Sequence, residues 1–184
     1  MKHLIPCVVG LALACTASSI RAGNATSGDV DFGKLTPSGP GGEFVEVHVR
    51  SNLIAMVSRL AEKAEPEIAQ LLRGLHAIRV NVIGLTDANR PEMEKRVQAI
   101  RADLEARQWE RVVTAQQPDE DVGVYLKTRG DEAVEGLVVT VLEGKKEAVL
   151  VNIVGDIRPE KLAVLGERFD IEPLKKIGHG IEKK

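Results

Sequence analysis

The fold of this chain is decided by residues 137–154, which have the sequence LVVTVLEGKKEAVLVNIV. Two apolar runs rich in β-branched residues flank the polar turn at residues 143–146, a pattern typical of a β-hairpin. Within each run, apolar residues occupy both odd and even positions, so neither face of these strands is expected to contact water. The hairpin is therefore predicted to lie in the middle of a sheet.

The rest of the chain supplies further strands and helices around this hairpin. Alternation of apolar and polar residues predicts strands near residues 44–50, 78–82, 109–115 and 122–126. Apolar stripes at helical spacing predict helices at Leu53, Met56, Val57, Leu60 and Ala64, at Ile68, Leu71, Leu72 and Leu75, and at Met93, Val97, Ile100 and Leu104. A closing helix is predicted to start at Pro159 and to bury Leu162 and Leu165. The order β-α-α-β-α-β-β-β-β-α predicts an α+β fold: a single mostly antiparallel sheet of five to six strands with helices packed on one face.

The N-terminus has the form of an export signal over residues 1–22. A short basic start precedes an apolar segment at residues 4–14, which is too short for a normal membrane span. Cleavage after Ala22 would give a periplasmic or secreted protein. The alternative is lipidation at Cys15, which follows Ala14 in a lipobox-like sequence and would give a lipid-anchored envelope protein. Both cysteines, Cys7 and Cys15, lie in this leader, so no disulfide or thiol site is expected in the mature domain.

The remainder divides into three parts by composition. Residues 23–42 are rich in glycine, serine and proline and are predicted to form a flexible arm or linker, which Phe32 and Leu35 attach to the body. Residues 43–177 are predicted to form a single α+β domain, and residues 178–184 a disordered tail. Loss of Lys2 and Arg21 with the leader changes the formal net charge from −2 to −4. That charge disfavours nucleic acid as a partner and leaves a lipid anchor as the only expected membrane contact.

Several segments resemble a bacterial family known as domain of unknown function 4252. The longest is Val149-Leu150-Val151-Asn152-Ile153-Val154-Gly155-Asp156-Ile157-Arg158-Pro159-Glu160-Lys161-Leu162. The others are Val30-Asp31-Phe32, Val45-Glu46-Val47 and Gly74-Leu75-His76-Ala77-Ile78-Arg79-Val80. The resemblance implies an exported protein or lipoprotein, often encoded near extracytoplasmic-function sigma factors, and it implies no activity, cofactor or catalytic residue.

No motif in the chain predicts catalysis, a cofactor or a metal. His48, His76 and His179 lack the close spacing of a metal site, and no serine lies in a nucleophile elbow. We therefore expect a protein that is not an enzyme. One alternative is a cofactor-free periplasmic hydrolase that uses scattered carboxylates such as Asp87, Asp156 and Glu160 as acid and base. Another is a small-ligand binder with a closed aliphatic cavity.

The apolar sheet suggests a different kind of site. If helices do not cover it fully, Val139, Val141, Val149, Val151 and Asn152 form an interaction face. That face would be covered by the N-terminal arm, by a second copy of the protein or by an envelope partner. The sequence thus favours a non-catalytic protein-interaction or signalling-accessory module of the cell envelope.

Overall fold

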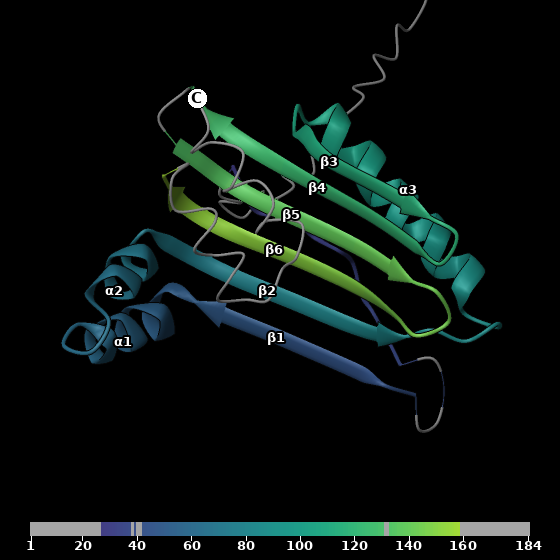
Figure 1. The fold of residues 1–184 in the computed structure, drawn as a ribbon, viewed down its shortest axis with the longest axis horizontal. Helices are drawn as coiled ribbons and strands as arrows, with labels where there is room; N and C mark the ends of the chain where they lie inside the picture. The colour runs from purple at the N-terminus through teal and green to yellow at the C-terminus, as the bar shows by residue number, and fades with distance from the viewer. Residues whose placement is uncertain (1–26, 38, 40–41, 131–132, 159–184) are drawn as a thin grey trace, which may run out of the picture.

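The computed structural model describes residues 27–37, 39, 42–130 and 133–158. They form one open, six-stranded antiparallel sheet in the order β1-β2-β6-β5-β4-β3 (Figure 1). The strands are β1 (Phe44–Arg50), β2 (Leu75–Gly84), β3 (Glu110–Gln117), β4 (Glu120–Arg129), β5 (Ala133–Glu143) and β6 (Glu147–Ile157). The helices are α1 (Ser51–Ala61), α2 (Pro66–Arg73) and α3 (Arg90–Ala106). The predicted α+β class, the antiparallel sheet and the element order as far as β6 are confirmed. The helix predicted from Pro159 and the tail lie outside the described residues.

The hairpin of β5 and β6 occupies the two central positions of the sheet, as its composition predicts. Its strands pair in one register from Gly136 and Val154 to Glu143 and Glu147. Gly144 takes a positive φ of 45° in the turn, which a residue without a Cβ adopts without strain. Most residues of both strands are buried on both faces of the sheet. The two central strands of the sheet are therefore also the strands that are buried on both faces.

One face of the sheet carries two rows built almost wholly from valine beside leucine and isoleucine residues, and we call it the valine face. The strand registers place Val47, Val80, Val151, Val139, Val124 and Val113 in one row that crosses every strand. A neighbouring row contains Val45, Val82, Val149, Val141, Val122 and Ala115. Side chains alternate between faces along a strand, so a shift of one residue in any pairing would break both rows. The valine rows therefore fix the register of the whole sheet.

The helices divide between the two faces, whereas the sequence predicted all of them on one face. The predicted stripe of α3 is confirmed, because Met93, Val97, Ile100 and Leu104 are all buried, and they pack on the face opposite the valines. Helices α1 and α2 lie at the end of the sheet where β1 stops and β2 starts (Figure 1). There, Ile54 and Leu71 join the core of the valine face. The sheet thus has one core on each side.

Residues 27–37, which we call the arm, lie on the α3 side of the sheet. The sequence predicts a flexible segment there, yet Val30 and Phe32 are buried with α3, and Leu35 is half-buried. Asn152 holds the arm: its Oδ1 accepts from the Val30 N–H at 3.0 Å, and its Nδ2 donates to the Gly28 carbonyl at 3.0 Å. Three arginines also donate to carbonyl oxygens of the arm: Arg79 to Val30, Arg107 to Asp29 and Arg96 to Lys34. The arm is therefore fixed along its length by side chains from four separate elements or loops.

Burial also sets the ionisation of Tyr125, the only tyrosine in the chain. Its side chain is fully buried under α3, and burial raises the pKa of the phenol above its usual value of 10.0, although the Arg101 and Arg111 guanidinium groups oppose this shift. A raised pKa means that folding favours the neutral phenol. Its contribution to stability is fully present below about pH 10 and is lost as pH rises through the folded-state pKa.

We therefore expect the free energy of unfolding to fall on titration above pH 10, and the loss to be smaller in Tyr125→Phe. Tyrosinate absorbance reports on this residue alone, so ionisation and unfolding can be followed in one sample. Ionisation of Tyr125 at its ordinary pKa without any loss of structure would contradict this prediction.

Candidate interaction surface

The interaction face expected from the sequence does not exist as one exposed surface. Val139 and Val151 lie in the valine face and are buried, while Val141 and Val149 are half-buried in it. Asn152 points to the opposite face, because adjacent residues of a strand alternate, and there it binds the arm. The arm thus packs on the α3 side of the sheet and does not cover the valine face.

Exposed apolar side chains gather instead in one short stretch of sequence. Among the described residues, seven large apolar side chains are exposed, and six of them lie between residues 45 and 60: Val45, Val47, Leu53, Met56, Val57 and Leu60. Leu60 is 75% exposed and Met56 is 53% exposed. We call these six residues the β1–α1 surface. All six lie on β1 or on the helix that follows it directly. A contiguous apolar surface is typical of a binding site, whereas single exposed residues are common everywhere.

The outward orientation of α1 has a clear packing cause. The predicted stripe has helical spacing, but its residues Leu53, Met56, Val57 and Leu60 face outward. The inward side is formed by Ile54 and Ser58, and Ser58 donates its hydroxyl to the Ala69 carbonyl of α2 at 3.0 Å. A small residue at this position lets the two helices approach closely, so the larger stripe is turned away. In the sequence, the feature that could have indicated this orientation is the small side chain of Ser58, four residues after Ile54.

The edge strand β1 presents backbone groups as well as side chains. The Gly84 N–H donates to the Glu43 carbonyl at 2.8 Å, so odd-numbered residues of this strand direct their backbone groups toward β2. The N–H and carbonyl groups of Phe44, Glu46, His48 and Arg50 therefore point to the outer edge of β1, which pairs with no other strand of the described residues and which we call the free edge. β1 pairs with β2 over seven residues without a bulge, whereas the other edge strand, β3, has an irregularity between Arg111 and Val113. Bulges hinder edge pairing, so β1 is the more open of the two edges.

Charged side chains of β1 lie on the side opposite the valines. Glu46 pairs in register with Asn81, and His48 with Arg79. Within the described part of the chain, none of the ion pairs includes Glu46, His48 or Arg50. These three exposed groups are thus available to a partner.

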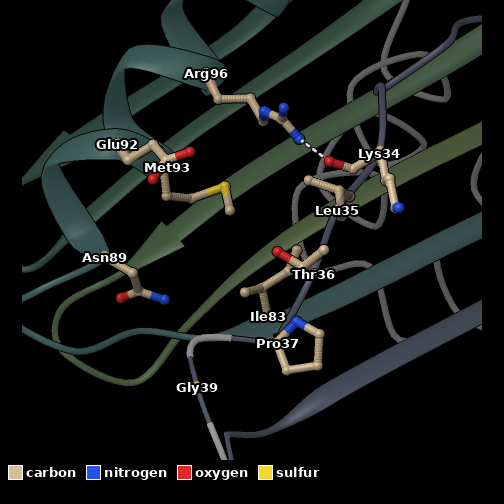
Figure 2. A pocket seen from close by; sticks show the side chains of 10 residues that line it. All are labelled: Lys34, Leu35, Thr36, Pro37, Gly39, Ile83, Asn89, Glu92, Met93 and Arg96. Atoms are coloured by element: carbon tan, nitrogen blue, oxygen red, sulfur yellow. Dashed lines mark hydrogen bonds between the residues drawn. The ribbon is translucent and has the colours of Figure 1, made fainter.

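A second feature is an open cavity of about 350 Å³ between the arm and α3. Figure 2 shows Leu35, Ile83 and Met93 as its apolar lining, with Arg96 at one side hydrogen-bonded to the Lys34 carbonyl at 2.7 Å. Lys34, Thr36, Asn89 and Glu92 make the rest of the wall largely polar. The cavity therefore differs from the closed aliphatic cavity expected of a small-ligand binder, and its arginine already holds the arm.

The carboxylates considered for hydrolysis do not meet. Asp87 follows the end of β2 and is paired with Lys145 at 2.9 Å, whereas Asp156 lies beside the start of β2, where its N–H donates to the Gly74 carbonyl. A ten-residue strand separates them, which corresponds to about 30 Å. Glu160 lies outside the described residues. Asp87 and Asp156 therefore cannot act as acid and base on one substrate.

Within residues 27–158, gaps excluded, no group of three or more histidine, cysteine or acidic residues is arranged to hold a metal ion. His48 and His76 are both exposed, and His179 lies outside the described part. No helix of that part is long and apolar enough to cross a membrane.

The described residues form a small α+β domain with one open antiparallel sheet and exposed apolar side chains on β1 and α1. The chain belongs to the family described as a domain of unknown function (DUF4252), which it matches over residues 42–165. The family resemblance of the sequence is thus confirmed, although the segment at residues 30–32 lies before the match. No curated protein and no solved structure matches the chain.

Proposed function

We propose that this protein is an exported, non-catalytic protein-interaction module of the cell envelope and that its partner binds the β1–α1 surface. The observation that carries the proposal is the gathering of six of the seven exposed large apolar side chains of the described residues between positions 45 and 60. Complete burial of a leucine or methionine side chain contributes about 1.5–3 kcal/mol. Burial of Leu60, Met56 and their neighbours by a partner would therefore contribute several kcal/mol to the free energy of association.

The free edge of β1 suggests how the partner binds. An added strand would satisfy the outward backbone groups of Phe44, Glu46, His48 and Arg50, and its apolar side chains would cover Val45 and Val47. Main-chain hydrogen bonds then provide affinity, and the flanking side chains provide specificity.

Export is supported by the leader sequence at residues 1–22. We expect the intact mass of protein purified from the envelope to begin at Gly23. A lipid adduct on Cys15 would instead assign the protein to the membrane surface, and an unprocessed Met1 would contradict export.

In-cell photo-crosslinking tests the interaction surface. We expect a photoreactive residue in place of Met56 to give a defined protein adduct, because this side chain is exposed at the centre of the α1 stripe. The same residue in place of Lys95, on the exposed side of α3, is the matched control and should give none. Leu60→Lys should reduce the Met56 adduct at least tenfold, since it places a charge in the apolar contact.

The proposal fails if Met56 yields no adduct, or if Met56 and Lys95 yield the same adducts. In either case the apolar stripe would not be a binding surface.

A further inference from the structure

We infer that the partner of the β1 edge is a second copy of this chain, whose own β1 pairs antiparallel to the first across a two-fold axis at Val47. The inference rests on the proposed function, because it uses the same surface, and it specifies the partner. Two such copies would form a continuous antiparallel sheet of twelve strands, since each contributes six.

Backbone geometry favours this register. With the axis at Val47, Phe44 of one copy lies opposite Arg50 of the other, and Glu46 lies opposite His48. All of these residues direct their N–H and carbonyl groups to the free edge, so each forms a hydrogen-bonded pair. The pairing uses the whole of β1 and ends where α1 begins at Ser51.

The two neighbouring symmetric registers, with the axis at Glu46 or at His48, would give a less stable strand pair. An axis at Glu46 would place the two Glu46 carboxylates directly opposite each other, where like charges destabilise a strand pair. An axis at His48 would require residues 51 and 52 as strand partners, although both belong to α1.

Charge in the proposed register is complementary on both halves of the interface. Glu46 of each copy faces His48 of the other, and its two diagonal neighbours are Arg50 and the more distant Glu46 of the other copy; pairs of opposite charge across strands stabilise a sheet. In the described part of the single chain these three groups have no ion-pair partner. A two-fold axis thus satisfies them with the chain's own residues.

The apolar side of the strand is complementary too. Val47 meets Val47, and Val45 meets Val49, so the valine rows continue from one sheet into the other. A seven-residue strand pair alone buries less than the roughly 1,200 Å² of a standard interface. The α1 stripes would add to this area, because each α1 begins beside the start of the other copy's β1. The two-fold arrangement is also closed, since it uses the same edge of both copies.

A disulfide tests this register directly. In a full-length chain with Cys7→Ser and Cys15→Ser, we expect Val47→Cys to form an intermolecular disulfide on mild oxidation. Opposed residues in a non-hydrogen-bonded antiparallel pair have Cα atoms about 4.5 Å apart, within the range that a disulfide spans. Val112→Cys is the matched control, because Val112 is an exposed valine on the other edge strand, and it should remain monomeric.

Charge exchange tests the pairing without a crosslink. His48→Glu and Glu46→Lys should each weaken the dimer about tenfold in sedimentation velocity. His48→Glu places two carboxylates opposite each other at two points, and Glu46→Lys places a lysine diagonal to Arg50 at two points. The double variant should return to within about threefold of the unsubstituted protein, since the introduced lysine of one copy then faces the introduced glutamate of the other. Circular dichroism checks that these exposed substitutions leave the fold intact.

The inference is overturned if the unsubstituted chain stays monomeric, if Val47→Cys and Val112→Cys crosslink alike, or if the double variant is no better than the single ones. A foreign adduct from Met56 together with a monomeric Val47→Cys chain would overturn self-association and leave the proposed function standing. Absence of any adduct would overturn both.

Discussion

Replacement of Gly28 by valine is expected to release the arm and to lower the free energy of unfolding by about 3–5 kcal/mol. A Cβ atom at position 28 would overlap the Glu135 carbonyl oxygen and would lie 2.8 Å from the Gly136 Cα. Both atoms belong to the backbone of β5, which cannot move without breaking the sheet. The arm would therefore detach, and Val30 and Phe32 would lose the burial that they have with α3.

Trp109 provides the readout for this variant. It is the only tryptophan, it is buried, and its ring lies beside Gly136, which also contacts Gly28. Urea unfolding followed by Trp109 fluorescence should show a lower midpoint for Gly28→Val, and the native spectrum should shift to longer wavelength. Thr36→Val, at an exposed arm position, is the control and should change little. Equal stability of Gly28→Val and the unsubstituted chain would show that the arm contributes nothing to the fold.

Asn152→Leu is expected to have the second large effect, a loss of about 3 kcal/mol. Asn152 is 1% exposed and makes three hydrogen bonds, to the Val30 N–H and to the carbonyls of Gly28 and Leu137. Leucine has a similar size but satisfies none of these groups, and a buried unsatisfied backbone group costs about 1–3 kcal/mol.

Asn81→Leu is a matched control on the same face of the sheet. Asn81 is also buried, but its side-chain oxygen has no hydrogen-bond partner among the described residues. Its replacement should therefore cost much less than replacement of Asn152, as measured by urea unfolding. Equal losses in the two variants would mean that burial of an amide, and not attachment of the arm, determines the effect.

Local patterns predicted the parts of this fold that depend on local chemistry. Two-sided apolar runs in β5 and β6 indicated central strands, and the stripe of Met93, Val97 and Ile100 indicated the buried side of α3. These predictions hold because the period of a strand or helix fixes which residues share a face. The antiparallel topology could also be predicted, because a short turn joins each of the strands β3, β4 and β5 to the next strand along the chain.

The parts that the sequence did not predict depend on long-range contacts. Asn152 interrupts an apolar run, and nothing local indicates that its amide binds backbone more than 120 residues away. The orientation of α1 likewise depends on a competition between its larger stripe and the close approach that Ser58 allows to α2. At the start of α3, the Asn89 Oδ1 accepts from the Thr86 N–H and makes no hydrogen bond to the helix.

Residue-resolved amide hydrogen exchange of β1 tests whether its edge binds a partner, because the N–H groups of Glu46 and His48 point to the free edge. We expect exchange of these two amides to slow strongly as protein concentration rises, since a second strand then pairs with the edge. The amides of Val45 and Val47 face β2 and should be protected at every concentration. Rapid exchange of Glu46 and His48 at all concentrations, with the bound partner present or absent, would contradict the assignment of this edge as the binding surface.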